Sequence, residues 1–569
     1  MHTSTSTTTL ALLLATAIPS PSSSAAAAAA AATTIAYEYC ALIDAGSTGN
    51  RIYTYRWPAR QYTISELPMR VPTTPTQCGG SYKSGSHPLA SIAPDPTFIA
   101  TAYAPLFAFA TETLRSEACG FEGETATEVP LFLTATAGMR VLPRANRTAI
   151  MGALRIALGT GSPFVFPTDG VPPAESHARI ISGEEEGVFG WITSNLLLEM
   201  AETSSHSGGR SLQDLQSGAL GAMDMGGAST QITFPPKSGG IMAGLFSIDL
   251  GPSTHRPTYT HSFLYFGLKE AMKQHVRAVA ASGGGADPCL PSGGSGGGTG
   301  DAALCRVDVE KMITDQRTLC RYADDEECSL LGTYQPPTAG VRFVAFSGFV
   351  YTYAFLFNAT TGPLDLDEPT TGLRARADAI CSMTEQDLVA YNALLVKGAQ
   401  SIPAYWDEFC FNANYFYSLL KDAYRMNATG EEHTFVDVYD KVESGELSYA
   451  LGAATFFVNH LPWAAAAAGS SGSASSASGG ALFSFNGAPQ LWFGFWIVAL
   501  VGCIVSAAAA AALFALRRSR GADGRIGGLL PFQTGLGAGG YGASGKSDVS
   551  VGRNELPSST FSLMPGQDE

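Results

Sequence analysis

Two segments of the chain share one design: Ile43-Asp44-Ala45-Gly46-Ser47-Thr48-Gly49-Asn50-Arg51 and Met223-Asp224-Met225-Gly226-Gly227-Ala228-Ser229-Thr230-Gln231. In each, an aspartate ends an apolar run, glycine and hydroxyl residues follow, and a strand-like alternation then resumes. This order predicts a strand, a tight turn and a returning strand. Two copies of the design in one chain predict a duplicated α/β fold with two loops that face each other.

The composition of these loops is typical of phosphate binding. Glycine lets the backbone approach a ligand and point its N–H groups at it, and hydroxyl side chains add donors for phosphate oxygens. An aspartate at the strand end can hold a hydrated divalent cation beside them. A plain Asp-Gly hairpin turn would explain one such loop equally well, so the prediction depends on the repetition.

The size and charge of the chain narrow its function. With 569 residues it has room for two or more domains, and 45% hydrophobic against 15% charged residues indicates a well-buried protein with a membranous part. The net charge of −15 argues against nucleic acid as a partner, because binding to a phosphate backbone needs a basic surface. An acidic enzyme can still bind nucleotides where metal and backbone amides neutralise the phosphates.

Both ends of the chain differ in composition from the middle. Residues 491–516 form a continuous apolar run with tryptophans at its start and arginines at its end, which predicts a transmembrane helix with a cytosolic C-terminus. We expect 463–490 to be a flexible linker and 517–569 a disordered cytosolic tail. Residues 1–34, with their alanine run, are expected to be a cleaved signal peptide or an uncleaved anchor, so the chain would cross the membrane once or twice.

The cysteines agree with a location of the middle region outside the cytosol. Apart from Cys40 and Cys503, eight cysteines form an even set there, as an oxidising compartment would allow, and no zinc-type C-x-x-C spacing occurs. Three glycosylation sequons, at Asn146, Asn358 and Asn427, fall in the same region.

Three further motifs lie between and after the two loops: Thr134-Ala135-Thr136-Ala137-Gly138-Met139-Arg140, Ile181-Ser182-Gly183-Glu184-Glu185-Glu186-Gly187, and Phe346-Ser347-Gly348-Phe349-Val350-Tyr351. Taken alone, the three glutamates would indicate a solvated helix face. All five motifs, in this order, resemble the five apyrase-conserved regions of the GDA1/CD39 family of nucleoside triphosphate diphosphohydrolases. The resemblance spans about Tyr37 to Asn459.

The family resemblance implies an α/β fold of two ribonuclease-H-like lobes, as in the actin/hexokinase-like superfamily. The first lobe would comprise residues 35–175 completed by 433–462, and the second 176–432. The active-site cleft would lie between the lobes, with one phosphate loop from each.

The resemblance also implies roles for single residues. Asp44 and Asp224 would hold Ca²⁺ or Mg²⁺, largely through water, and Glu186 would be the general base that deprotonates the attacking water. Residues that match those positioning this water or the terminal phosphate are Thr136, Ser229 and Gln231.

Phosphate and nucleobase contacts are implied in the same way. Donors to the phosphates are expected from Gly46, Ser47, Thr48, Gly226, Gly227, Ala228, Arg51 and Arg140. For the two arginines, a direct phosphate contact and a local salt bridge are both open. Tyr351 matches an aromatic position associated with stacking on the base, although a core aromatic is the alternative.

Some features depart from the family pattern or leave choices open. Asn50 replaces a small hydroxyl residue and Tyr449 replaces a tryptophan; we expect neither to touch the base or the metal aspartates. A Cys381–Cys410 disulfide is similar to the family's last one. The other pairings, Cys78–Cys119, Cys289–Cys320 and Cys305–Cys328, are hypotheses, because sequence does not fix connectivity.

The leading functional hypothesis is a membrane-anchored apyrase that hydrolyses nucleoside tri- and/or diphosphates to the monophosphate. Its catalytic domain would face the extracellular space or the lumen of the Golgi or another endomembrane. One alternative is another actin-like-fold phosphotransferase, such as an exopolyphosphatase or sugar kinase, although the Ser-Gly-Glu-Glu-Glu-Gly segment favours water as the acceptor. A catalytically silent nucleotide-binding surface protein is the second alternative.

Overall fold

A computed structural model describes most of the region between the two ends of the chain. The described residues are 37–59, 61–62, 75–84, 87–123, 126–166, 177–204, 220–237, 241–249, 255–294, 296–317, 320–322, 327–395, 408–426, 434–442, 445–460 and 464–465. The expected N-terminal segment, membrane helix and cytosolic tail, and nearly all of the linker, lie outside these residues. Among the helices within them, none combines the length and apolar character that a bilayer crossing requires.

The first loop joins the two central strands of a mixed sheet. Strand β1 (Tyr37–Gly46) pairs antiparallel with β2 (Gly49–Pro58), and Gly46 lies opposite Gly49, so the turn between them is Ser47-Thr48. On its other side β1 is parallel to β6 (Leu131–Ala135), which is parallel to β7 (Ala178–Ile180). Two short strands pair with β2: β4 (Thr76–Gln77) and β5 (Tyr82–Ser84). The predicted strand, turn and returning strand are confirmed.

The second loop has the same place in a second mixed sheet. Strand β8 (Gly221–Met225) pairs antiparallel with β9 (Ser229–Phe234), with Asp224 opposite Gln231. On its other side β8 is parallel to β12 (Arg342–Ser347), which is parallel to β14 (Phe435–Tyr439). The sheet is completed by β11 (His255–Leu264) beside β9, and by β10 (Leu245–Asp249) and β13 (Thr361–Pro363) at its edges. Each sheet therefore has a hairpin followed by two parallel strands.

Two strands pair across the boundaries of the expected lobes. Strand β7 joins the first sheet although it lies beyond residue 175, and β14 joins the second sheet although it lies within 433–462. The reason is the repeated topology, in which a second parallel strand completes each sheet. The chain thus changes sheet after β7 and again after β14, a few residues later than the division by sequence.

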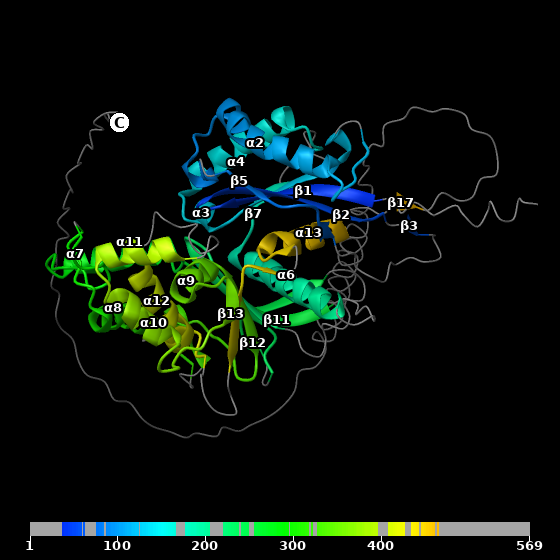
Figure 1. Cartoon of the computed structure of the whole chain (residues 1–569). Helices are drawn as coiled ribbons and strands as arrows, with labels where there is room; N and C mark the ends of the chain where they lie inside the picture. Colours follow the sequence, from blue (N-terminus) through cyan, green and yellow to red (C-terminus); the bar gives the residue numbers. More distant parts are fainter. Residues whose placement is uncertain are drawn as a thin grey trace, which may run out of the picture. The chain divides into compact units, whose positions relative to one another are not determined.

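Helices cover both sheets (Figure 1). Helices α2 (Pro96–Arg115) and α4 (Arg144–Gly161) pack on one face of the first sheet, where they share a hydrophobic core with β1 and β6. Helices α6 (Gly183–Ser204) and α13 (Tyr449–His460) lie on its other face, in a core that also includes Ala222, Val344 and Phe346 of the second sheet. These two helices therefore connect the sheets.

The remaining helices belong mainly to the second sheet. They are α7 (Leu268–Ala281), α8 (Ala302–Arg317), α9 (Gly348–Phe357), α10 (Leu373–Cys381), α11 (Glu385–Leu394) and α12 (Phe409–Ser418), the last continued by a π-helical turn (Leu419–Ala423). The short α3 (Ala137–Arg140) follows β6, and a two-residue pairing joins β3 (Gln61–Tyr62) to β17 (Ala464–Ala465).

Four disulfides occur among the described residues. Cys78–Cys119 and Cys381–Cys410 agree with expectation. The other two hypotheses were wrong, because the bridges are Cys289–Cys305 and Cys320–Cys328. Each observed disulfide joins two cysteines that are near in sequence, with separations of 16 and 8 residues, whereas the expected pairs were farther apart. Cys40 is a free, buried thiol within β1.

Candidate active site

A cavity of about 570 Å³ opens between the two glycine-rich loops. It is lined by Gly46, Ser47, Thr48, Gly49, Gly226 and Gly227 from the loops and, among the other expected site residues, by Asp44, Arg51, Thr136, Glu186, Asp224 and Tyr351. A larger hollow of about 710 Å³ runs along α2 near Phe107, but its lining includes none of the expected site residues. The cavity between the loops is therefore the candidate active site.

Glycine makes the close approach of the loops possible. A Cβ added to Gly227 would lie 2.7 Å from Ser47 Oγ of the opposite loop. A Cβ on Gly138, in the α3 turn, would lie 2.9 Å from the Ser47 Cα. Gly49 has φ +145°, which residues with side chains rarely adopt. The two loops and the α3 turn thus meet at Ser47.

The start of α6 carries the glutamate motif into this site. Ser182 and Glu185 form a capping box: the Glu185 N–H donates to Ser182 Oγ and the Ser182 N–H donates to the Glu185 carboxylate. Gly183 and Gly187 lie against the second sheet, where an added Cβ would meet Ser262 at 2.2 Å and Thr233 at 2.7 Å. This close packing leaves Glu186 only 6% exposed, on the cavity wall. The motif is thus not a solvated helix face.

Glu186 is held by a buried network. Arg140 Nη2 donates to Glu186 Oε2 at 2.7 Å and to Ser229 Oγ at 3.0 Å. Gln231 Nε2 lies 3.2 Å from the same carboxylate oxygen and 2.7 Å from Ser229 Oγ. Burial raises the pKa of Glu186, and the Arg140 guanidinium opposes this rise. The network joins the expected base to the two residues expected to position water.

Two further carboxylates share the cavity with Glu186. Burial, with the nearby Glu186 charge, raises the pKa of Asp224 to about 8, and burial also raises the pKa of Asp44. Three like charges in one buried site favour a bound cation that would offset their repulsion, and carboxylate oxygens are the ligands that Ca²⁺ and Mg²⁺ prefer. The donor set therefore fits a divalent cation.

A second cluster of potential metal ligands lies away from the cavity. Within the described ranges, the one group of three ligand atoms all within 4.8 Å of one another is His275, Asp287 and Cys289. That group is not a metal site, because Cys289 is in a disulfide and His275 Nε2 lies 2.9 Å from Asp287 Oδ1.

The expectation for Tyr449 was wrong. Its hydroxyl donates to Asp44 Oδ1 at 2.6 Å, across 405 residues of sequence, so this residue touches one of the expected metal aspartates. The error arises because α13 brings Tyr449 against the strand pair that carries Asp44 and Thr134. Asn50 behaves as expected: its side-chain amide donates to the His87 carbonyl at 3.0 Å.

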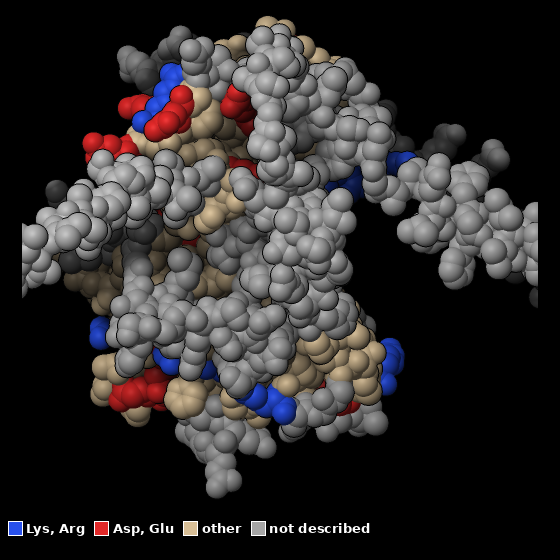
Figure 2. Space-filling model, turned by 90° about the vertical axis from the view of Figure 1, so that its right-hand side faces the viewer, with Lys and Arg blue, Asp and Glu red and all other residues tan. Residues whose placement is uncertain are grey.

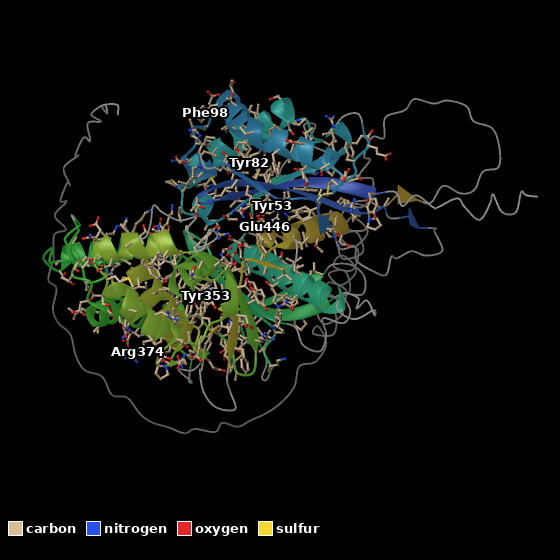
Figure 3. The ribbon with its side chains drawn as sticks, in the orientation of Figure 1. Tyr53, Tyr82, Phe98, Tyr353, Arg374 and Glu446 are labelled. Carbon is tan, nitrogen blue, oxygen red and sulfur yellow. A yellow bond between two sulfur atoms is a disulfide. The ribbon has the colours of Figure 1, made fainter. Side chains whose placement is uncertain are left out.

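Three positively charged side chains line the cavity beside the loops. Arg51 lines the cavity and lies 3.2 Å from Glu446 of β16 (Gly445–Glu446), in the region between the sheets where Figure 3 labels Glu446 and Tyr53. Lys83 lines the cavity beside the first loop, with its Nζ 3.4 Å from Thr48 Oγ1. Lys269 lines it beside the second loop, with its Cδ 3.6 Å from a Cβ placed on Gly227.

The remaining expected residues divide into two sets. Thr136 lines the cavity at the start of α3, and Tyr351, 44% exposed, lines it at the start of α9. Ser229, Gln231, Arg140 and Ala228 do not line the cavity; the first three lie behind Glu186, in its hydrogen-bond network. Arg140 thus forms the salt bridge that the sequence left open as an alternative.

Sequence reasoning missed several cavity residues, above all Lys83, Lys269 and Ser347. A signal existed for Ser347, which directly precedes Gly348 inside a quoted motif. The two lysines stand outside the motifs, so only the folded chain brings them to the loops.

Comparisons with known proteins identify the family of the chain. Residues 31–470 match the model of the GDA1/CD39 (nucleoside phosphatase) family. Ectonucleoside triphosphate diphosphohydrolase 2 of Homo sapiens is 30% identical over 459 residues, covering 75% of this chain and 83% of the relative. The Mus musculus protein of that name is 29% identical over 465 residues, covering 75% and 83%.

A solved structure agrees in fold. The crystal structure of nucleoside triphosphate hydrolases from Neospora caninum matches with a TM-score of 0.50 and 15% identity, covering 74% of this chain and 93% of that one. At this identity the match supports the α/β fold alone.

Proposed function

The chain belongs to the GDA1/CD39 (nucleoside phosphatase) family, and on this premise we propose that it hydrolyses nucleoside tri- and diphosphates to nucleoside monophosphate and phosphate. One observation carries the proposal. Glu186 is buried on the wall of a cavity that also contains Asp44, Asp224 and both glycine-rich loops. A carboxylate, a cation site and a phosphate cradle in one cavity are the parts that phosphoryl transfer to water requires.

In this proposal the loops bind the phosphates. The backbone N–H groups around Gly46 and Gly226, with the hydroxyls of Ser47 and Thr48, would donate to phosphate oxygens. Arg51, Lys83 and Lys269 line the cavity beside the loops, where their charges would offset those of a polyphosphate. Tyr351 would stack on the nucleobase, since its ring is partly exposed at the cavity wall.

Glu186 would accept the proton of the attacking water. Arg140 and Gln231 fix its carboxylate by hydrogen bonds at 2.7 and 3.2 Å. Ser229 Oγ accepts from both of these residues, so Ser229 would position the base from behind Glu186. Thr136, on the cavity wall, would add a further donor.

Asp44 and Asp224 would hold the divalent cation, Ca²⁺ or Mg²⁺, largely through water. When bound, the cation neutralises phosphate charge and orients the terminal phosphate for in-line attack. Their position at the ends of β1 and β8, beside the two phosphate loops, supports this assignment.

We also propose that the two sheets are the ribonuclease-H-like lobes of the actin/hexokinase-like superfamily. The matching order β5-β2-β1-β6-β7 and β11-β9-β8-β12-β14 supports this, with α6 and α13 between the sheets. The lobes would then be about 35–181 and 182–440, with 441–462 returning to the first.

The proposed location is the extracellular or luminal side of a membrane, with 491–516 as the anchor. The four disulfides support an oxidising compartment. On the face in Figure 2, the described basic residues lie in small separate groups and form no broad basic patch. The net charge of −15 supports a nucleotide substrate over a nucleic acid.

Phosphate release from the purified full-length chain tests the proposed function. ATP, ADP, UDP and GDP are each supplied with Ca²⁺ or Mg²⁺, and parallel reactions contain EDTA. We expect phosphate from at least one nucleotide, and none with EDTA. Release from inorganic polyphosphate alone, or only after a sugar is added, would instead support an exopolyphosphatase or a kinase. Nucleotide binding without release would indicate a silent nucleotide-binding protein.

A further inference from the structure

The Tyr449 hydroxyl lies within hydrogen-bond distance of three oxygens, including the Thr134 carbonyl at 3.3 Å. It donates to Asp44 Oδ1 at 2.6 Å and lies 3.0 Å from Thr134 Oγ1. A phenol has a single hydrogen, so when Tyr449 donates to Asp44, Thr134 must donate to Tyr449. Thr134 and Asp44 are neighbours in the parallel pairing of β6 and β1. This pairing brings both residues to the Tyr449 hydroxyl.

This bond restricts the Asp44 carboxylate. Its Oδ1 accepts from the phenol, and Asp44 and Tyr449 both line the cavity. A charge-assisted bond of this length is among the stronger hydrogen bonds in proteins. Partners of this kind, one step removed from a cation, set ligand orientation and cation affinity.

Asp224, at the equivalent place in the second sheet, has a hydroxyl partner of its own. The Ser347 side chain, between β12 and α9, hydrogen-bonds to the Asp224 carboxylate and lines the cavity. Its backbone has φ 58° and ψ −119°, a conformation that residues with side chains rarely adopt. Strained backbone of this kind persists only where the surrounding structure fixes it, and it is common at functional sites.

We propose that Tyr449 and Ser347 are positioning residues that fix Asp44 and Asp224, respectively, in the orientation that binds the divalent cation. This inference rests on the proposed function, because it takes both aspartates as the cation site. It assigns the helix α13 and the β12–α9 turn a part in cation affinity rather than in nucleotide contact.

The test measures cation binding directly. Mn²⁺ binding to the full-length protein is followed by electron paramagnetic resonance in the presence of a non-hydrolysable ATP analogue. Loss of one such partner typically weakens metal affinity by about 10–100-fold. We therefore expect Tyr449→Phe to raise the Kd for Mn²⁺ about tenfold or more, while the nucleotide KM at saturating cation stays within about twofold.

Two further variants separate positioning from folding. Tyr259→Phe removes another buried phenol, which does not line the cavity and donates to the Tyr334 carbonyl at a distance of 2.6 Å. This variant should lower the stability of the protein without changing the Kd for Mn²⁺. Ser347→Gly removes the hydroxyl but also relieves the strain, so it should weaken Mn²⁺ binding with no loss of thermal stability. This variant keeps the test decisive if Tyr449→Phe does not fold.

An unchanged Kd for Mn²⁺ in Tyr449→Phe, or in Ser347→Gly where the former does not fold, would overturn the inference. The same holds if the wild type binds no Mn²⁺. Failure of the proposed function is a different result: the wild type would then release no phosphate from any nucleotide.

Discussion

Replacing Arg140 by methionine should change the pH dependence of hydrolysis, because Arg140 favours the ionised form of the proposed base. Its Nη2 lies 2.7 Å from Glu186 Oε2, and both side chains are largely buried. With an effective dielectric constant of about 20, opposite charges at this distance attract by roughly 6 kcal/mol. If structural rearrangement offsets three quarters of this attraction, the remaining quarter still changes the protonation equilibrium of Glu186 about tenfold.

The sign of the effect follows from the charge. Burial already raises the pKa of Glu186, and Arg140 limits that rise. Without the guanidinium the pKa rises further, so a larger fraction of Glu186 is protonated at low pH and cannot accept a proton. Activity of Arg140→Met should fall about tenfold or more on the acid side and recover as the pH rises.

The assay is phosphate release from the preferred nucleotide as a function of pH, with thermal melting measured beside it, because losing one partner of a buried pair costs about 3–5 kcal/mol of stability. Arg179→Met is the matched control, since Arg179 pairs with Glu185 at 2.7 Å outside the cavity. It should leave the pH profile unchanged. A loss of activity in Arg140→Met that is equal at all pH values would refute the reasoning and indicate a direct phosphate contact.

Three other changes give distinct outcomes. Gly227→Ala would place a Cβ 2.7 Å from Ser47 Oγ, so kcat/KM should fall about tenfold or more with little change in melting temperature. Tyr351→Ala should raise KM roughly 5- to 100-fold at similar kcat, since base stacking contributes about 1–3 kcal/mol. His177 stacks on Phe132, and burial lowers the pKa of its imidazole to about 4. Because this folded-state pKa lies below the unfolded value, the free energy of unfolding should fall by up to roughly 3 kcal/mol as the pH falls from 6.5 to 4. His177→Phe should remove that part of the decline in urea unfolding.

Each of these three predictions has an outcome that would contradict it. Gly152, where an added Cβ meets nothing within 4 Å, offers Gly152→Ala as a control for Gly227→Ala, and equal activity of the two variants would mean that the loops do not need their close approach. A Tyr351→Ala variant with unchanged KM would exclude stacking. Identical pH profiles of unfolding for wild type and His177→Phe would show that His177 does not govern acid stability.

The sequence predicts well what is local. Asp44 and Asp224, the two turns and Glu186 are defined by contiguous motifs, and the strand register carries them to one cavity. Glycine spacing is informative for the same reason, because Gly187 lies where the helix touches the second sheet.

What the sequence did not predict depends on packing between distant segments. Tyr449 reaches Asp44 across 405 residues, and Arg140 reaches Glu186 across 46. No periodicity encodes such contacts, since they arise from the way α13 and α3 dock on the sheets. The errors in the disulfide pairing have a similar origin. The sequence does not distinguish one cysteine from another as a partner, so the pairing depends on which cysteines the fold brings together.

Hydrolysis by Glu186→Gln, with Glu185→Gln as its matched control, tests the central claim most directly. The two carboxylates are adjacent in sequence, but Glu186 lines the cavity whereas Glu185 caps α6 and pairs with Arg179. We predict that Glu186→Gln lowers kcat for nucleotide hydrolysis by about 100-fold or more, as expected for loss of a general base, while Glu185→Gln stays near the wild type. A Glu186→Gln enzyme that hydrolyses nucleotide at the wild-type rate would contradict the account.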